Sequence, residues 1–323
     1  MALPTSGPLS LNQIHIEAGG TSGTTASIND ADIRALIGKA SGATMSFSEW
    51  YGASGSVTIN LTIAANTNNY NIQSSRGGTY VAGVTTVNVT INSGVTVGST
   101  STGTYALETG SSWATGDVIN IINNGTVKGR GANGGAGGDS FYNTINVAGN
   151  TSDPGAAGGV GGNAFRAQFA TTFTNNGSVY GGGGGGGGGG GWTGLTGGKS
   201  VLATATGGGG GGGGAGVNAG SGGSGGVATS SSGGTLRNGT AGSTGSATAG
   251  GAGGASGNNE GAGGNGGAGG GLGSSGTAGS ATADTGFTNA AGGSGGLAGF
   301  YQVGSSLING GSGVGGTVGG RSS

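Results

Sequence analysis

The chain contains no cysteine and only three prolines among its 323 residues. The absence of cysteine excludes a disulfide framework and a thiolate metal site. The scarcity of proline excludes collagen, whose triple helix needs abundant proline beside a strict glycine period. Charge is also scarce: nine Lys and Arg residues stand against ten Asp and Glu residues. Without a basic stripe we expect no nucleic-acid partner. We also expect no metal ion and no cofactor.

Long apolar runs are missing as well. No stretch reaches the roughly 18 apolar residues of a membrane span, so we expect no membrane insertion. The first twenty residues have neither a basic segment nor an apolar segment of the kind found in signal peptides. The sequence therefore predicts a protein that is made in a cytoplasm and is not secreted by the standard route.

The side chains of common catalytic sites are hard to assemble. His15 is the only histidine, so the second half cannot hold a Ser-His-Asp set. The acids are scattered, and the one close pair, Asp30 and Asp32, suits a helix start better than a glycosidase site. Residues 194–200 lack the spacing of a phosphate loop. We expect that the protein is not an enzyme.

Residues 1–53 predict a small helical module. Residues 10–13 and 46–49 are capping boxes, and a further helix is expected from an Asn29 cap to Ile37. A module of this size is marginal alone, so we expect it to attach the chain to a partner. The alternative is a self-contained cap on the following β-layer. The candidate attachment residues are Leu11, Ile14, Phe47, Trp50 and Tyr51.

Residues 54–128 predict a β-rich domain. Apolar and polar residues alternate over 57–63 and 87–91, and 118–122 is a third apolar run. Turn residues such as Asn, Ser and Gly separate these runs. We expect a short β-layer here.

A weak internal repeat extends past this layer. Segments that begin at Asn92, Asn123 and Asn175 align without gaps, at spacings of 31 and 52 residues. Each is a turn followed by a short strand. The variable spacing predicts rungs of an irregular β-layer better than it predicts a regular solenoid.

Glycine supplies 93 residues and dominates from residue 129 onward, mostly as a GGx repeat of period three. A helix of the polyproline-II type also has three residues per turn, so this repeat places glycine on two of its edges. Backbones can then approach and hydrogen-bond laterally. We expect residues 129–323 to form a polyglycine-II bundle with almost no helix or sheet, and the all-glycine run 181–191 to lie in its middle. The alternative is a flexible linker. The expected scaffold positions include Gly134, Gly135, Gly185, Gly186, Gly210, Gly253 and Gly266.

Richer segments separate the glycine runs and carry most of the aromatic side chains of this half. Regular rods joined by unlike loops are typical of a scaffold that displays binding loops. Trp192 follows the longest glycine run, so it lies at a rod end and is a candidate receptor contact. The alternative is that Trp192 and Tyr180 plug the two ends of the bundle. Aromatic and long side chains are the usual anchors of such loops. The receptor-binding candidates are Phe141, Tyr142, Trp192, Leu195, Lys199, Leu236, Arg237, Phe287, Phe300 and Tyr301.

Two parts of the chain resemble known phage proteins. The motifs LSLNQ (9–13), SIND (27–30) and MSFSEWYG (45–52) resemble a short module at the start of many phage tail and fibre proteins. The run VKGRGANGG (127–135), followed by NNGSVY and the glycines of 175–191, resembles the receptor-recognising tip adhesin of T4-like long tail fibres. The second resemblance covers about residues 119–323, and residues 1–53 depart from that family.

The resemblance implies a fold and a function. It implies a polyglycine-II sandwich whose distal hypervariable loops bind an outer-membrane protein or glycan of the host. It also implies a virion location on a tail fibre, with other fibre proteins as partners and self-association as a further candidate. The alternatives are a structural filament or head-decoration protein packed through glycine helices, and an ice-binding protein. Both should have short, similar turns, whereas the loops here are long and unlike each other.

Overall fold

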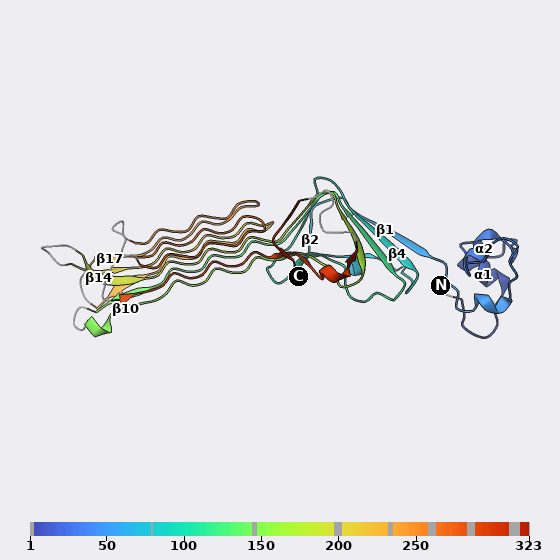
Figure 1. The fold of residues 1–323 in the computed structure, drawn as a ribbon, viewed down its shortest axis with the longest axis horizontal. Helices are drawn as coiled ribbons and strands as arrows, with labels where there is room; N and C mark the ends of the chain where they lie inside the picture. The colour runs from blue at the N-terminus through green and yellow to red at the C-terminus, as the bar shows by residue number, and fades with distance from the viewer. Residues whose placement is uncertain are drawn as a thin grey trace.

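The computed structural model describes residues 3–78, 80–143, 147–196, 202–231, 235–257, 263–282, 288–309 and 317–322. The molecule is elongated (Figure 1). A helical module lies at one end, sheets occupy the middle, and long glycine segments run side by side to the other end. The described chain is mostly β with few helices, and at that level the predicted fold class is confirmed.

The helical module contains α1 (Leu11–Glu17), α2 (Ala31–Ala35) and the 3-10 helix η1 (Phe47–Trp50). Both predicted capping boxes are present, on Ser10 and on Ser46. The module has its own buried cluster, in which the Trp50 indole donates to the Ile33 carbonyl oxygen at 3.1 Å. The fully or nearly buried members are Leu3, Ile14, Ile33 and Trp50.

The second helix of the module is shorter than expected. Asp30, and not Asn29, is the N-cap residue of α2. Asn29 accepts a hydrogen bond from the Arg34 guanidinium instead, at 3.1 Å. The helix ends before Ile37 because Gly38 adopts a φ of 64°, which leaves the helical region.

Over the described residues, three parallel sheets form a three-sided coil of five rungs. Each side contains one strand from each rung, and all strand pairs between neighbouring rungs are parallel. The first sheet contains β1 (Val57–Ile63), β4 (Thr85–Ile91), β7 (Val118–Asn123), β12 (Thr171–Asn175) and β20 (Ile308–Asn309). The second contains β2 (Thr67–Asn68), β5 (Thr96–Gly98), β8 (Thr126–Lys128), β13 (Ser178–Tyr180) and β21 (Thr317–Gly319). The third contains β3 (Tyr70–Asn71), β6 (Tyr105–Glu108), β11 (Asn163–Arg166), β19 (Phe300–Val303) and β22 (Arg321–Ser322). The short helices α3 (Ile72–Ser75) and η3 (Ser305–Leu307) lie at corners.

Alternation along the strands builds the core of the coil. In β4 every second residue is buried, and the stacked inward residues Val87 and Ile119 are fully buried. The outward residues form polar ladders. The Asn120 amide donates to Asn88, and the Asn88 amide donates to Asn60, each at 3.0 Å. Period-two patterning therefore fixes the inner and outer faces.

The internal repeat marks neighbouring rungs. Asn175 pairs with Asn123 and Ser178 with Thr126, which confirms the spacing of 52 residues. The spacing of 31 residues between the first two segments differs by one residue from the strand pairing on either side of the turn. Ile91 pairs with Asn123, a difference of 32, and Val97 pairs with Val127, a difference of 30. The turn 92–95 is two residues longer than the turn 124–125, which causes the change.

The coil is also more regular and longer than the sequence suggested. An irregular layer was the expected arrangement, but the pairing repeats on three sides over five rungs. Strands at 163–180 and 300–322 lie in the same sheets as strands at 57–128, so the pairing crosses the boundary expected between residues 128 and 129. The expectation of almost no sheet after residue 129 is therefore wrong. These late strands supply buried Phe165, Phe173 and Val179 to the core.

The glycine segments are two insertions at one corner of the coil. Residues 129–162 leave after β8 and return to β11, and residues 181–299 leave after β13 and return to β19. We call the extended segments rods. None of the ten rods carries a helix or strand over its described residues. They are 129–139, 153–162, 181–191, 207–216, 220–227, 238–246, 250–257, 263–271, 274–282 and 290–299.

Backbone hydrogen bonds with a period of three join the rods. Along 182–191, successive N–H groups donate in rotation to rods 153–162, 207–216 and 274–282, at 2.8–3.2 Å. The carbonyl groups of this rod accept from three others, 129–139, 263–271 and 290–299. Six neighbours thus surround rod 181–191, and all its glycines are buried. Its predicted central place is confirmed.

The outer rods show the other half of the pattern. In rod 220–227, Ser221 and Ser224 are exposed, whereas Gly220, Gly223 and Gly226 are buried. The seven named scaffold glycines lie in the rods. A Cβ atom added at any of them would lie closer than 3.0 Å to a neighbouring backbone oxygen. Backbone–backbone packing without side chains is therefore what these positions require.

Candidate functional site

The rods reverse direction at the end of the molecule far from the coil (Figure 1). Rods 129–139 and 153–162 run antiparallel, as do rods 181–191 and 207–216. The other three outgoing rods, 220–227, 250–257 and 274–282, end at this same end. We call this end the tip. Its described residues are 139–143, 147–153, 192–196, 202–206, 227–231, 235–238 and 288–290.

Two small sheets hold the tip together. One contains β9 (Ser140–Tyr142), β10 (Thr151–Ser152) and β16 (Ala228–Ser230), with the 3-10 helix η2 (Val147–Gly149) nearby in sequence. The other contains β14 (Trp192–Thr196), β15 (Leu202–Thr206), β17 (Thr235–Arg237) and β18 (Thr288–Asn289). The Ser152 hydroxyl donates to the Thr288 carbonyl oxygen at 3.0 Å and links the two. Segments far apart in sequence thus form one surface.

Aromatic residues lie beneath this surface. Trp192 is fully buried at the end of rod 181–191, and a Cβ atom at Gly194 would meet its ring. Tyr142 is 8% exposed and packs with Ala205 and Ala228. These positions fit the alternative in which Trp192 plugs the end of the bundle.

Other predicted residues are accessible. Leu236 on β17 is 46% exposed, Arg237 beside it is exposed, and Phe141 on β9 is half-buried. Sequence reasoning missed Val227, which is 48% exposed, and the exposed Asn238 and Asn289. The available signal was position, because Val227 and Asn238 are non-glycine residues at rod ends and Asn289 directly precedes a rod.

The remaining candidates lie elsewhere. Phe300 and Tyr301 belong to β19 in the coil, at the opposite end of the rods from the tip. Tyr301 packs against the core of the coil, and the Arg321 guanidinium lies 4.2 Å from the centre of the Phe300 ring. Leu195 lies on β14, and its side chain is outside the described part. Lys199 and Phe287 lie outside the described residues.

Charge is sparse at the tip. Among its described residues the charged side chains are those of Asp139, Asp153 and Arg237. The Asp139 carboxylate accepts from the Val227 N–H at 2.7 Å and so joins two rod ends. Within the described chain no group of three or more His, Cys, Asp or Glu side chains could hold a metal ion. The helices described are all too short or too polar to cross a membrane.

A network of four hydrogen bonds surrounds the Asp117 carboxylate in the coil. Burial raises the pKa of Asp117, but hydrogen bonds from the Tyr80 hydroxyl and from the N–H groups of Ala114, Thr85 and Gly83 outweigh it and hold that pKa below its ordinary value. Asp117 thus joins two corners of neighbouring rungs. This arrangement is structural.

The attachment candidates divide into two groups. Ile14 and Trp50 are fully buried in the core of the helical module, and Leu11 is half-buried against it. Phe47 and Tyr51 are 41% and 37% exposed. Ile16, which sequence reasoning missed, is 46% exposed. The accessible apolar surface therefore belongs to Phe47, Tyr51 and Ile16.

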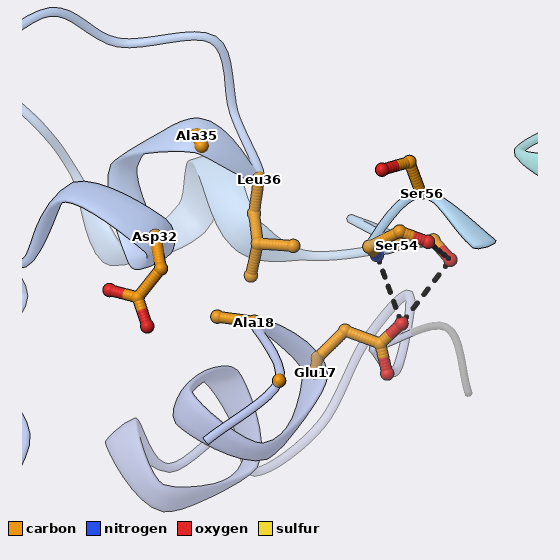
Figure 2. A pocket seen from close by; sticks show the side chains of 9 residues that line it. Glu17, Ala18, Asp32, Ala35, Leu36, Ser54 and Ser56 are labelled. Carbon is orange, nitrogen blue, oxygen red and sulfur yellow. Dashed lines mark hydrogen bonds between the residues drawn. The ribbon is translucent and has the colours of Figure 1, made fainter. Parts of the chain in front are cut away.

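A groove of about 420 Å³ is lined by the end of α1, by α2 and by residues 54–56, which lead into the coil. Figure 2 shows Glu17 at the end of α1 reaching this segment. The Glu17 carboxylate accepts from the Gly55 N–H at 3.0 Å and from the Ser54 hydroxyl at 3.3 Å. These hydrogen bonds link residues 54–55 to the helical module.

These features define a fibre-like protein in which stacked backbones carry a composite surface at the far end. The family model for the phage tail fibre adhesin Gp38 matches residues 58–322, and the chain belongs to that family. It is a phage tail-fibre adhesin. The match begins after the helical module.

Comparison with solved structures finds one described as "Crystal structure of the gp37-gp38 adhesin tip complex of the bacteriophage S16 long tail fiber". It shares 20% sequence identity with this chain, with a TM-score of 0.46. The alignment covers 98% of this chain and 99% of that one. A search of curated proteins gives no match.

Proposed function

We propose that the adhesin binds a host cell-surface receptor, an outer-membrane protein or glycan, through the loops of the tip. The observation that carries this proposal is the return of the rods at one end, which gathers segments between residues 139 and 290 into one surface. The tip lies opposite the helical module, so it is the end that can face a cell (Figure 1).

The rods are proposed to be polyglycine-II helices. The rotation of hydrogen bonds among three neighbours along 182–191 supports this, because a helix with three residues per turn directs every third N–H the same way. Such a scaffold needs no side-chain core. Its loops can therefore vary without disturbing the rods.

Within the tip, the proposed contact residues are the accessible ones, Phe141, Leu236 and Arg237. Aromatic and guanidinium groups are common anchors in protein recognition, and Leu236 adds apolar surface beside Arg237. Buried Trp192 and Tyr142 are proposed to hold the loops in place. For Leu195, Lys199 and Phe287 receptor contact stays a prediction from the sequence.

Alanine variants at Arg237, Trp192 and Tyr301 test this assignment. Each variant is assayed for melting temperature and for competition with phage adsorption to host cells. We expect Arg237→Ala to reduce competition at an unchanged melting temperature. Trp192→Ala and Tyr301→Ala should lower the melting temperature, because both side chains pack inside the molecule. A Leu236→Ala variant is assayed in the same way. If both Arg237→Ala and Leu236→Ala compete with phage adsorption as well as the unmodified protein does, the proposed surface is refuted.

The helical module, residues 1–53, is proposed to attach the adhesin to a fibre partner in the virion. Exposed Phe47, Tyr51 and Ile16 supply apolar surface for that contact. We propose that the rest divides into the coil, 54–128 with 163–180 and 300–322, and the glycine insertions. A protein lacking 1–53 should still compete for cells but should not join particles. Loss of competition with assembly intact would reverse the assignment.

A further inference from the structure

The third sheet of the coil carries a small pocket, which we call the side pocket. Its volume is about 190 Å³, and the residues that line it are Asn69, Gly103, Thr104, Tyr105, Glu108 and Arg166. Tyr105 and Glu108 are the two ends of β6, and Arg166 ends β11. The coil lies between the helical module and the rods, so the side pocket is far from the tip (Figure 1). A space of this size admits one sugar ring and is too small for a folded peptide segment.

The side pocket contains an ion pair whose charges cancel. The Arg166 guanidinium donates to the Glu108 Oε2 atom, and the Asn71 amide donates to the Oε1 atom at 2.8 Å. The Glu108 and Arg166 side chains are 23% and 32% exposed. Each carboxylate oxygen can accept a second hydrogen bond, and a guanidinium has several N–H donors. Glu108 is the only hydrogen-bond partner of this guanidinium in the described chain. The pair can therefore accept from, and donate to, a neutral ligand that carries hydroxyl groups.

Tyr105 adds an aromatic wall beside the ion pair. The central carbon of the Arg166 guanidinium lies 4.2 Å from the centre of the Tyr105 ring. Tyr105 is half-buried, and its hydroxyl has no hydrogen-bond partner within the described residues. The face of an aromatic ring is weakly negative and attracts the C–H groups of a sugar ring. An aromatic wall with a few polar groups is the usual composition of a small-molecule site.

Asn69 holds the rim of the side pocket in an unfavourable backbone conformation. Its φ is 51°, and no other described residue except glycine has a positive φ. The Asn69 amide donates to the Thr100 hydroxyl at 2.6 Å, and its side-chain oxygen accepts from the Thr100 N–H at 3.0 Å. Residues in such conformations gather at ligand sites. The rim is therefore fixed before any ligand binds.

We propose that the side pocket binds one neutral pyranose unit of a host surface glycan. The C–H face of the sugar lies against Tyr105, and its hydroxyl groups donate to Glu108 and accept from Arg166. A charged sugar would bring its charge against the like-charged member of the ion pair, so the pocket selects a neutral one. The site does not rest on the proposed role of the tip, because no tip residue lines it.

Binding of one sugar unit should be weak, with a Kd of roughly a millimolar or higher. A weak contact is useful when a second one is present on the same chain. A glycan bound at the coil holds the adhesin close to the cell and raises the effective concentration of the receptor at the tip.

Saturation-transfer difference NMR on the unmodified full chain tests the proposal. The probes are the methyl glycosides of glucose, galactose, mannose and N-acetylglucosamine, because the methyl group stands for the rest of a glycan chain. We expect saturation of the ring C–H protons in at least one probe, and weaker saturation in the anionic methyl glucuronide. No saturation in any neutral probe, or stronger saturation in the glucuronide, overturns the proposal. Saturation of the free sugars alone also overturns it, because the pocket then has no room for a chain.

Two variants locate the bound sugar. Tyr105→Leu removes the aromatic wall, and Gly103→Trp fills the pocket. A Cβ atom on Gly103 would meet no atom beyond its chain neighbours closer than 3.9 Å, so this variant should keep the melting temperature of the unmodified chain. It keeps the test decisive if Tyr105→Leu is unstable. Both variants should lose the saturation signal.

Arg237→Ala at the tip is the matched control and should keep the saturation signal. A signal that persists in Gly103→Trp, or one that disappears in Arg237→Ala, overturns the side pocket as the sugar site. Competition with phage adsorption by Arg237→Ala tests the proposed function of the tip separately, so the two proposals can fail independently.

Discussion

At the scale of single residues, the missing side chain of glycine decides the packing of this adhesin. Gly186 donates to the Gly212 carbonyl oxygen and accepts from the Gly135 N–H. A Cβ atom there would lie closer than 3.0 Å to the Gly267 backbone. Since backbone atoms cannot rotate away as a side chain can, the rods must separate to admit it.

We therefore expect Gly186→Ala to destabilise the protein by at least about 3 kcal/mol, the upper range for overpacking a core. Ser224→Ala on an outer rod is the matched control. Its side chain faces solvent, so its effect should stay within about 0.5 kcal/mol. Denaturant unfolding of the two variants checks this prediction. Equal stabilities would mean that the rods do not pack backbone to backbone.

Asp117 gives a residue-scale prediction with a pH dependence. Its pKa is lowered in the folded state, so it contributes stability above its unfolded value of about 3.9. That contribution disappears as pH falls through the lowered folded pKa. Asp117→Asn should cost about 1–3 kcal/mol at pH 7, because the amide keeps only one acceptor oxygen and the donors bonded to the other lose their acceptor.

The difference between Asp117→Asn and the unmodified protein should shrink below about pH 4, as Asp117 itself becomes protonated. Thermal unfolding at pH 7 and pH 3 measures the change. Tyr80→Phe keeps the ring that packs on Trp113 and removes only one donor to Asp117. At pH 7 the melting temperature of Tyr80→Phe should lie between those of the unmodified protein and Asp117→Asn. A difference that is the same at both pH values would contradict the assigned network.

At the scale of elements, stacked turns hold neighbouring rungs in register. Buried Asn123 donates to the Asn175 side-chain oxygen at 2.8 Å and accepts from the Gly125 N–H at 3.1 Å. Its neighbour Asn124 is half-buried and accepts from the exposed Asn176 amide. The same residue type thus has two environments in one turn.

We expect Asn123→Ala to cost about 2 kcal/mol, because it leaves buried polar groups of two rungs unpaired. Asn124→Ala should cost less than about 0.5 kcal/mol, since water replaces its partner. Urea unfolding compares these adjacent variants. A larger effect at Asn124 would show that the turn is held by its outer face.

Features that depend on residues close together in the sequence could be predicted from it. The capping boxes at Ser10 and Ser46, the alternation in 57–63 and the central place of 181–191 follow from short-range rules. The closed, three-sided coil did not follow. Its strands are separated by the glycine insertions, so the link between Phe165 and Leu107 depends on pairing over 58 residues.

The candidate tip was only partly readable for the same reason. Residue type selected Leu236 and Arg237, which are exposed, and the end of the longest glycine run located Trp192 at a rod end. Composition alone could not separate Phe300 and Tyr301 from the tip. They share the aromatic character of tip residues, and their place in β19 is set by the return of the last rod to the coil.

At the scale of the whole molecule, the glycine rods are excursions from a continuous coil. The two ends of each insertion are adjacent: a Cβ atom on Gly181 would lie 3.1 Å from the Gly299 Cα atom. Replacing 130–161 and 182–298 by short Gly-Ser turns should leave a coil that melts cooperatively with a β-type circular dichroism spectrum. Competition for host cells should be lost. An unfolded product would show that the rods are required to hold the rungs.

In the proposed function the tip faces the host and the helical module faces the virion. Gold labelling of single cysteines tests it most directly, because the natural chain contains no other thiol. The label is placed on Ser231→Cys at the exposed tip and phage particles are imaged by electron microscopy. Gold is expected at the outermost ends of the tail fibres, beyond the position of the same label on an exposed module residue, Ser22→Cys. Gold along fibre shafts or on the head, or module labels lying outermost, would contradict it.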